Sequence, residues 1–381
     1  MRVVVIGAGV GGLAVARALI ADGHEVECYE RADSLRTSGA AFTLWSNGTA
    51  VLHALGVPYD DLGAPIDVLG FDRGSDGRKL MDVDVARAAA RYGHPHRSTP
   101  RRDVIARLAD GLPPGTLRFG RRAVGVDQDP SAAEVRFAEG PAVRADLVIA
   151  ADGQRSAIRD AVFGDPTEPA GWGTWQALTP VDVETTRSRR GVMILGREGT
   201  CGLLPAGNGL LQWWFDRRWD ADAPQPSSVT AMLKEHFGHW ASPVVELLAA
   251  ADDTQIEFFA HRRQKVTSGW SRGRVVLLGD AAHTMPPTVA QGANQALEDA
   301  WALARGLRVT GDLRAGLAEY ERSRIKGARL TARVAGSEMT DRYRPLSTLL
   351  TPDALITRFY TRWLRMVSTI LNEQPGEQAD R

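Results

Sequence analysis

The first 30 residues carry the pattern that most restricts the fold. A run of apolar residues, Val3 to Ile6, precedes a glycine-rich turn, Gly7 to Gly12, and an Ala- and Leu-rich stretch that ends at Ala21. The apolar run predicts a strand that is buried on both faces, and the stretch after the turn predicts a helix. A second strand is expected at residues 25–29. The order strand, helix, strand predicts parallel strands joined by a crossover helix, which is the start of a doubly wound α/β domain.

The glycine-rich turn reads Gly7-Ala8-Gly9-Val10-Gly11-Gly12. In a Gly-x-Gly-x-x-Gly turn, the first glycine permits the tight bend, the second lets a pyrophosphate approach the backbone, and the third allows helix and strand to pack closely. The phosphates then lie at the helix N-terminus, where free N–H groups and the helix dipole favour negative charge. Glu30 ends the second strand, where a carboxylate accepts hydrogen bonds from ribose hydroxyls. A turn without a ligand would leave this acid unexplained, so the sequence predicts a bound dinucleotide, either FAD or NAD.

Composition excludes several classes of protein. The 381 residues carry 46 basic and 46 acidic side chains, so the net charge gives no reason to expect a nucleic-acid partner. The two cysteines, Cys28 and Cys201, lie in apolar stretches and are too few for a disulfide framework or a zinc site. No stretch has the roughly 18 consecutive apolar residues of a membrane-spanning helix. We therefore expect a reduced, cytoplasmic protein with no metal site and no stable membrane insertion.

A second string follows a buried strand in the middle of the chain. The run Leu147 to Ala150 predicts the strand, and the string Ala151 to Arg159 begins with Ala151-Asp152-Gly153. A polar side chain directly after a parallel strand can reach a ligand at that edge of the sheet. By itself, however, this string also fits an ordinary strand-to-helix turn with an Asp cap.

A third string follows the strand expected at residues 274–278. It runs from Gly279 and Asp280 to Pro287 and continues from Gln291 into an amphipathic helix. Asp280 at the strand end can hold a polyol hydroxyl, and the helix that starts near Gly292 offers free N–H groups to an electron-rich ring carbonyl. A loop without a ligand would not need so long a string.

Between the second and third strings the sequence changes character. Tryptophans cluster between residues 172 and 219, and alternating stretches near 174–181, 191–196, 201–204 and 210–216 predict an antiparallel sheet. Residues 39–56 predict a strand and a short helix with Ser46-Asn47-Gly48 as the turn between them. Further predictions are a hairpin at 65–84, a helix at 101–108 and a last helix at about 352–371. The last helix carries one apolar stripe, made of Ile356, Phe359, Tyr360, Trp363, Val367 and Ile370.

The three strings, in this order and spacing, resemble the group A flavoprotein monooxygenases of the para-hydroxybenzoate hydroxylase fold. The resemblance covers about residues 1–310, and the middle of the chain resembles the small urate-hydroxylase-like and tetracycline-degrading members. It implies FAD as cofactor. It also implies that the cofactor-binding residues are Gly7, Gly9, Gly11, Gly12, Glu30, Arg31, Ala41, Arg101, Asp152, Gly153, Gly279, Asp280, Gly292, Ala293 and Asn294. The stretch Ser38 to Ala41 would border the flavin, and Pro286 would lie near its reactive face and contact the substrate.

The implied fold is a Rossmann-like FAD-binding domain with an inserted antiparallel-sheet domain and C-terminal helices. We expect the FAD-binding domain to be discontinuous, at residues 1–70, 98–165 and 270–335. The substrate-binding domain would comprise residues 71–97 and 166–269, and residues 336–381 would form a C-terminal helical segment.

The implied reaction inserts one oxygen atom of O2 into an aromatic or polyketide-like small molecule through a flavin C4a-hydroperoxide, with NADPH or NADH as electron donor. Epoxidation and Baeyer–Villiger insertion on the same fold, and a flavin oxidoreductase without oxygen insertion, stay open as alternatives. So does a non-catalytic FAD-binding protein, although such a protein would not need the string from Pro286 to Asn294. A monomer or a homodimer is expected.

The substrate contacts are predicted from strand alternation. Thr174 and Gln176 share one face of their strand, and Gln212 and Trp214 share one face of theirs, so these four are expected to face the substrate. Aligned with the urate hydroxylases, the positions of the substrate-binding arginine, tyrosine and aspartate read Cys201, Gln212 and Thr288, which argues against urate. His283 is expected to be a structural histidine beside the cofactor, and no residue is assigned as a catalytic base.

Overall fold

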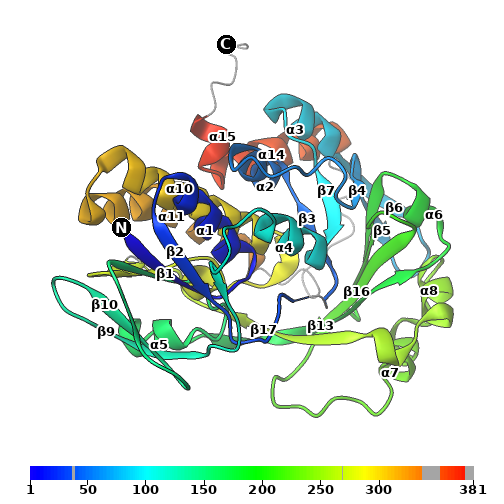
Figure 1. Cartoon of the computed structure of the whole chain (residues 1–381). Helices are drawn as coiled ribbons and strands as arrows, with labels where there is room; N and C mark the ends of the chain where they lie inside the picture. The colour runs from blue at the N-terminus through cyan, green and yellow to red at the C-terminus, as the bar shows by residue number, and fades with distance from the viewer. Residues whose placement is uncertain (37–38, 268, 337–351, 374–381) are drawn as a thin grey trace.

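The computed structural model describes residues 1–36, 39–267, 269–336 and 352–373. The molecule is built around two large sheets (Figure 1). One is the parallel sheet that begins at the N-terminus. The other is a seven-stranded, mainly antiparallel sheet, whose segments are inserted in the sequence between strands of the first sheet. The predicted α/β class with an inserted antiparallel sheet is therefore confirmed.

The parallel sheet has six strands in the order β18-β19-β12-β1-β2-β8. Its central strands are the runs of Val, Ile and Leu that the sequence predicted, and only β18 is antiparallel to its neighbour. The bounds are β1 (Arg2–Ile6), β2 (Glu25–Tyr29), β8 (Leu117–Arg118), β12 (Leu147–Ala150), β18 (Ser271–Arg272) and β19 (Val275–Leu277). Because β12 lies beside β1, β19 lies beside β12 and all three strands are parallel, the three predicted strings emerge at one edge of this sheet.

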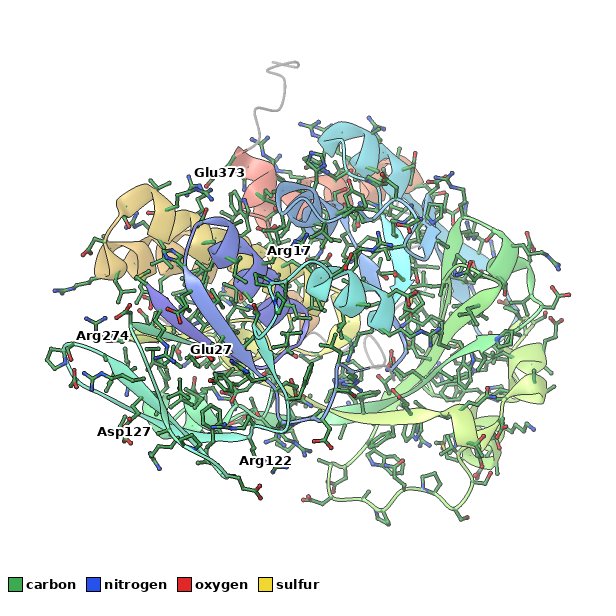
Figure 2. The ribbon with its side chains drawn as sticks, in the orientation of Figure 1. Arg17, Glu27, Arg122, Asp127, Arg274 and Glu373 are labelled. Atoms are coloured by element: carbon green, nitrogen blue, oxygen red, sulfur yellow. The ribbon has the colours of Figure 1, made fainter. Side chains whose placement is uncertain are left out.

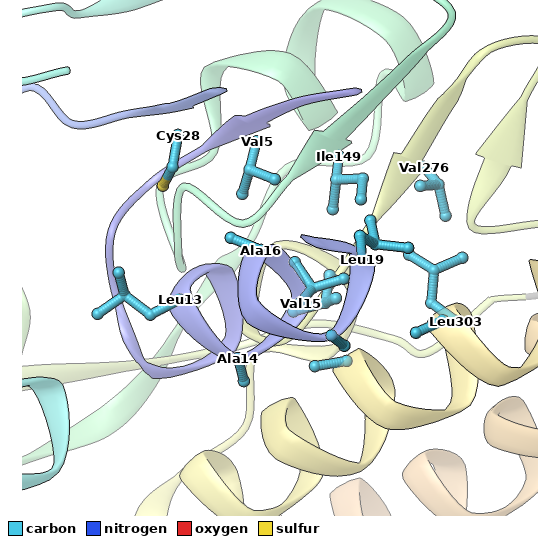
Figure 3. Close-up of a cluster of buried hydrophobic side chains, with 14 of the residues drawn as sticks. Val5, Leu13, Ala14, Val15, Ala16, Leu19, Cys28, Ile149, Val276 and Leu303 are labelled. Carbon is cyan, nitrogen blue, oxygen red and sulfur yellow. The ribbon is translucent and has the colours of Figure 1, made fainter. Parts of the chain in front are cut away.

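Helix α1 (Val10–Ala21) covers one face of the parallel sheet. Figure 3 shows its Leu13, Val15 and Leu19 side chains in the same cluster as Val5, Ile149 and Val276 from three strands. Leu303 of helix α10 (Gly292–Thr310), which packs beside α1, joins the same cluster next to Leu19 and Val276. These side chains are wholly buried, which is the packing that a continuous apolar strand requires.

The seven-stranded sheet has the order β17-β13-β16-β15-β14-β5-β6. The predicted hairpin at 65–84 is confirmed and supplies two of these strands, of which β5 pairs in parallel with β14. The bounds are β5 (Val68–Arg73), β6 (Lys79–Asp84), β13 (Glu168–Pro180), β14 (Arg190–Leu195), β15 (Thr200–Pro205), β16 (Leu210–Arg218) and β17 (Glu257–Arg263). A second core, rich in Trp and Phe, lies on one face of this sheet under helices α7 (Val229–Phe237) and α8 (Val244–Ala250).

Two three-stranded sheets and several helices complete the fold. The sheets are β3 (Ala41–Leu44), β7 (Arg97–Pro100) and β4 (Ala64–Pro65), and β11 (Val143–Ala145), β10 (Ala133–Phe137) and β9 (Ala123–Gln128). The remaining helices are α2 (Ser46–Ala54), α3 (Val85–Tyr92), α4 (Arg101–Ala109), α5 (Ala157–Phe163), α6 (Glu184–Arg187), η1 (Asp253–Gln255), α9 (Asp280–His283), η2 (Pro287–Val289), α11 (Leu313–Ala335), α14 (Asp353–Met366) and α15 (Ile370–Glu373). None of the helices in the described ranges is long and apolar enough to cross a membrane.

Surface contacts tie the small sheet β9–β11 to the parallel sheet. In Figure 2, Asp127 and Arg274 are labelled at this end of the molecule. Asp127 pairs with Arg136 across the hairpin at 2.6 Å, and the Arg274 guanidinium donates to the carbonyls of Pro130 and Asp146 at 2.8 and 2.9 Å. Arg274, which directly precedes β19, thereby joins this strand to the hairpin β9–β10 and to Asp146, which directly precedes β12.

The prediction of a turn at Ser46-Asn47-Gly48 is wrong. These residues form the first turn of α2, and all three are buried. The Ser46 hydroxyl donates to the carbonyl of His94 at 2.8 Å, and Asn47 donates to Gln291 at 3.1 Å. Such tertiary hydrogen bonds satisfy polar side chains that otherwise favour turns.

The last predicted helix is broken. Helix α14 ends at Met366, and the short helix α15 begins at Ile370. Between them, the backbone N–H of Thr369 donates to the carboxylate of Glu298 at 2.8 Å, and the Ser368 hydroxyl binds the same carboxylate. The buried acid thus takes the N–H groups that a continuous helix would use itself. Of the predicted tail, residues 337–351 and 374–381 lie outside the described residues.

Candidate functional site

One large cavity, with a volume of about 1910 Å³, joins the two main sheets. One part, which we call the cradle, is lined by the turn before α1 and by the residues that follow β2, β12 and β19. The other part, the sheet chamber, is lined by one face of the seven-stranded sheet, by η2 and by α14. The geometry thus brings the predicted cofactor residues and the predicted substrate residues onto one continuous space.

The glycine-rich turn forms the floor of the cradle. Gly7 has a φ of +103°, and a Cβ there would lie 2.4 Å from the Ala151 carbonyl oxygen. A Cβ on Gly12 would lie 1.9 Å from the Gly7 carbonyl oxygen, and one on Gly11 would lie 2.5 Å from Leu278. These three glycines let α1 pack onto the strands. Gly12 itself does not line the cavity, although the other three glycines of the turn do.

Gly9 differs from the other glycines of the turn. It is the N-cap residue of α1, makes no side-chain cap, and a Cβ there would have no protein atom within 4 Å. The added carbon would instead occupy cavity space at the helix N-terminus, which Gly9 lines. Uncapped N–H groups beside this space fit a bound pyrophosphate.

Glu30 holds the turn in place. Its carboxylate accepts hydrogen bonds from the backbone N–H groups of Ala8 at 2.9 Å and Ala32 at 3.0 Å. A carboxylate has four acceptor positions, so two stay available for ribose hydroxyls on the cavity side. Arg31 lines the cavity beside it.

Arg101 and Asp280 place opposite charges on the cradle wall. Arg101 begins α4 and faces the cavity without a salt bridge to any described residue. Burial lowers the pKa of Arg101, and the nearby charge of Arg36 adds to the shift. Asp280 begins α9 beside β19, and burial raises the pKa of its carboxyl although the side chain opens onto the cavity. An unpaired guanidinium fits an anionic cofactor, and a strand-end carboxylate fits a polyol hydroxyl.

Asp152 offers an unsatisfied acceptor in the cradle. Its Oδ2 accepts from the N–H of Ile158 at 3.5 Å, while its Oδ1 is buried without any hydrogen-bond partner. Burial raises the pKa of this carboxyl. Because buried polar atoms are almost always paired, Oδ1 is a position where a ligand hydroxyl or N–H fits. Gly153 lines the cavity next to it.

The start of α10 faces the cradle with free backbone N–H groups. Gly292 and Ala293 line the cavity, and no side chain caps this helix. Asn294 does not line it. Its side chain accepts from the N–H of Trp45 at 2.9 Å and donates to the carbonyls of Thr43 and Ala290 at 2.9 and 3.0 Å. Asn294 therefore fastens β3 and α2 to α10, and a direct cofactor contact through its side chain stays a prediction.

The four predicted substrate residues all line the sheet chamber. Thr174 and Gln176 of β13 lie opposite Asp216 and Trp214 of β16 in the antiparallel register. Gln212 donates to the Ala41 carbonyl at 2.7 Å, and its Oε1 is buried without a partner. Pro286, the fifth predicted residue, is buried and is not part of the cavity lining, where its neighbours Met285 and Pro287 are found.

Of the three positions aligned with the urate hydroxylases, Cys201 does not face the chamber. On β15, Thr200 and Leu204 line the chamber, whereas Cys201 and Leu203 lie in the core on the opposite face of the sheet. Side chains alternate along a strand, so a shift of one residue exchanges the two faces. Thr288, by contrast, does line the cavity.

Sequence reasoning missed a polar cluster in the sheet chamber. Asp216 accepts hydrogen bonds from the hydroxyls of Thr174 and Thr200, the second at 3.0 Å, and from Trp214 Nε1 at 3.1 Å. The Nε2 atom of His261 lies 2.6 Å from Thr174 Oγ1. Burial raises the pKa of Asp216 to about 6 and lowers the pKa of His261 to about 4. The alternation that selected Gln212 and Trp214 would have found Asp216 two residues further along.

His283 lies off the cavity in a buried charge network. Its Nε2 is 2.6 Å from Asp299, which also accepts from Arg324 Nε at 2.7 Å. Arg324 lies 3.6 Å from Glu298, and these side chains are wholly buried. Burial alone would raise the pKa of Asp299, but the charges of His283 and Arg324 outweigh it and the pKa is lowered. The network joins α10, α11 and the C-terminal segment.

The cradle as a whole fits FAD. It combines an uncapped helix N-terminus, an unpaired arginine, an orphaned Asp152 oxygen and a strand-end carboxylate on one surface. Ala41, whose carbonyl is held by Gln212, borders the passage from the cradle to the sheet chamber. Ser38 of the same stretch lies outside the described residues.

Comparisons with known proteins agree with this geometry. Residues 1–334 match the family model described as FAD binding domain. An FAD-dependent urate hydroxylase of Klebsiella pneumoniae is 31% identical over 334 residues, which are 86% of this chain and 87% of the relative. The 3-amino-4-hydroxybenzoate 2-monooxygenase PtnB3 of Streptomyces platensis is 33% identical over 344 residues, 86% of this chain and 85% of that one. The crystal structure of Klebsiella pneumoniae HpxO with FAD and uric acid superimposes with a TM-score of 0.90 at 28% identity, covering 96% of this chain and 97% of that chain.

Proposed function

The chain belongs to the family of FAD-dependent monooxygenases that share this FAD binding domain, and from that membership we propose that it hydroxylates an aromatic or polyketide-like molecule with a large apolar surface. Its cofactor is FAD, and its electron donor is NADPH or NADH. Bound FAD supplies the redox chemistry, by which electrons from the nicotinamide activate oxygen and one oxygen atom enters the substrate.

The lining of the sheet chamber supports this substrate class. Apolar side chains from five strands and from α14 face the space, namely Leu69, Phe71, Met81, Val83, Met193, Leu204, Trp214, Ile356, Phe359, Tyr360 and Trp363. A chamber of this composition excludes water and binds a flat, apolar body. Four of the six residues in the apolar stripe predicted on the last helix thus form part of the wall of the sheet chamber.

Few cations are available to a carboxylate substrate in this chamber. On the cavity face of the sheet, the cationic side chains are Arg218 and Arg262 among the described residues. Arg262 already donates to Thr167 at 2.6 Å, and Arg218 is engaged elsewhere. The urate and aminohydroxybenzoate substrates named for the relatives are small and polar, so we propose a different, more apolar substrate here.

We also propose the residue roles and domain division that the sequence suggested. Gly9, Arg101, Asp152 and Asp280 would contact FAD, and Gln176 and Trp214 the substrate. Separate hydrophobic clusters under the two main sheets support a discontinuous FAD-binding domain with an inserted substrate domain. A monomer or homodimer would suffice, because both parts of the cavity come from one chain.

Anaerobic mixing of the FAD-loaded protein with NADPH, and separately with NADH, tests the proposal. We expect one of them to bleach the oxidised flavin band. Mixing with 18O2 and a probe should then give a product with one 18O atom from 1-naphthol or 4-propylphenol, and none from the carboxylate control 4-hydroxybenzoate. A protein that binds no FAD contradicts the proposal. Reduction that yields hydrogen peroxide alone with every probe favours the oxidoreductase alternative.

A further inference from the structure

The hydrogen bonds around Asp216 leave acceptor positions unused on this face of the sheet. Trp214 Nε1 and the hydroxyls of Thr174 and Thr200 all donate to Asp216, and the amide nitrogen of Gln212 donates to Ala41. The Trp214 N–H and the two threonine hydroxyls are therefore occupied within the protein, and Gln212 uses one of its two N–H groups. Two acceptors are left over on this sheet face, the orphaned Oε1 of Gln212 and the remaining acceptor position on Asp216, while, among the described residues, Tyr360 and Trp363 of α14 keep an unpaired hydroxyl and an unpaired indole N–H.

Asp216 is a buried carboxylate without a cationic partner. It is 8% exposed, lines the cavity, and forms no salt bridge with any residue in the described ranges. Its three hydrogen-bond donors are neutral, and a carboxylate has room for a fourth. An ionised carboxylate that is removed from water is costly unless a positive group or a further donor meets it.

One indole ring contacts this carboxylate, and a second packs on His261 nearby. The indole of Trp214 donates to the carboxylate, and the ring of Trp172 lies 4.4 Å from that of His261, centroid to centroid. Burial keeps His261 neutral near pH 7 because its pKa is lowered to about 4. A carboxylate beside indole rings favours a cationic or N–H-bearing group on a flat molecule.

We propose that Asp216 binds a nitrogen of the substrate, an ammonium group or a ring N–H, and thereby selects nitrogen-bearing aromatic compounds. This inference rests on the proposed function, since it assigns the sheet chamber to the substrate. Gln212 Oε1, four residues earlier on the same face of β16, would accept a second donor from the same molecule.

Two probes of equal length separate this role from packing. Tyramine and 4-propylphenol differ in a terminal ammonium group against a methyl group. We expect Asp216→Asn to weaken the binding of tyramine to the FAD-loaded protein by at least about tenfold, because a charge-assisted hydrogen bond is lost. The binding of 4-propylphenol should change by less than about twofold. Isothermal titration calorimetry at pH 7.5 measures both, and flavin content and circular dichroism check the fold.

A second variant keeps the charge and removes one neutral donor. Thr200→Val should preserve the preference for tyramine and move the pH midpoint of its binding upward, because the ionised carboxylate loses one hydrogen bond. In the wild type, tyramine affinity should rise with pH through about 6, where Asp216 ionises. The groups that face Asp216 are Thr174, Thr200, Trp214, Arg218 and His261, and the Cys201 thiol lies behind it on the opposite face of the sheet. His261 does not titrate in that window because burial lowers its pKa to about 4, and burial raises the pKa of the Cys201 thiol well above its usual value.

Equal tyramine affinity in the wild type and Asp216→Asn, including no binding to either, overturns the inference. An equal loss for both probes also overturns it, because a structural role alone would produce that result. Flavin reduction and 18O incorporation are measured without tyramine, so failure of the proposed function is seen separately.

Discussion

The side-chain amide of Gln212 donates a 2.7 Å hydrogen bond to the backbone carbonyl of Ala41, and so connects β16 to β3 across 171 positions of sequence. Ala41 lies where the cradle opens into the sheet chamber, and Gln212 belongs to the wall of that chamber. This hydrogen bond thus links the walls of the two parts of the cavity.

Gln212→Leu should destabilise the protein by about 1–3 kcal/mol, because the buried Ala41 carbonyl loses its donor. It should also weaken FAD binding, since Ala41 borders the cradle. Gln176→Leu is the matched control, because Gln176 lines the same chamber without a hydrogen bond to the described residues. Urea unfolding and FAD titration of both variants measure the difference. Similar losses in the two variants would show that the Gln212 contact is unimportant.

Gly9→Ala should impair FAD binding, whereas Gly12→Ala should impair the stability of the fold. The new Cβ at position 9 meets no protein atom and enters the cavity, so the apoprotein should keep its melting temperature while FAD affinity falls at least tenfold. The new Cβ at position 12 would lie 1.9 Å from a carbonyl oxygen, so this variant should lose at least about 2 kcal/mol of stability. Calorimetry of the apoproteins and FAD titration distinguish the two. A Gly9→Ala protein with wild-type FAD affinity would refute the placement of the pyrophosphate.

Arg324→Leu should cost about 3–5 kcal/mol, because it removes the guanidinium that the buried acids Asp299 and Glu298 share. The pKa of Asp299 should rise once the guanidinium no longer offsets burial. Arg305→Leu is the control. Its ion pair with Glu373 is partly exposed, and its loss should cost at most about 1 kcal/mol. Equal costs in chemical denaturation would show that the buried network adds nothing beyond a surface pair.

Asp216 and His261 should give opposite pH dependences of stability. The pKa of Asp216 is raised to about 6, so the folded state holds its proton more tightly than the unfolded state and stability falls as pH rises from about 4 to 6. The pKa of His261 is lowered to about 4, so the unfolded state takes up the proton first and stability falls as pH drops from about 6.5 to 4. Each effect is on the order of 3 kcal/mol, and the two nearly cancel.

Removal of either group should reveal the other. Relative to the wild type, Asp216→Asn should lose stability on acidification between pH 6 and 4, and His261→Phe should gain it. Guanidinium denaturation at half-unit pH steps provides the comparison. Parallel curves for the two variants and the wild type would show that neither group titrates in this range.

The cradle was largely predictable because its residues are set by local sequence. A glycine turn between a strand and a helix, and polar residues directly after buried strands, lie where parallel topology brings strand ends together. Gly9, Asp152 and Asp280 were all found in this way, and all three line the cavity. For the sheet chamber, the sequence predicted only which residues share one face of a strand. Alternation does not show which residues of the neighbouring strands lie beside them.

The errors share one physical cause, which is tertiary contact. Ser46 lies in a helix because its hydroxyl donates to the backbone carbonyl of His94, 48 positions along the chain. The last helix broke because Glu298 captures the N–H of Thr369. Asp216 drew no attention because its partners come from separate strands, Thr174 on β13 and Thr200 on β15.

The order of elements along the chain has a consequence for synthesis on the ribosome. The last strand and helix of the cradle, β19 and α10, end at Thr310, whereas α14, which walls the sheet chamber, begins only at Asp353. Translation therefore releases all the segments of the cradle while one side of the chamber is still missing.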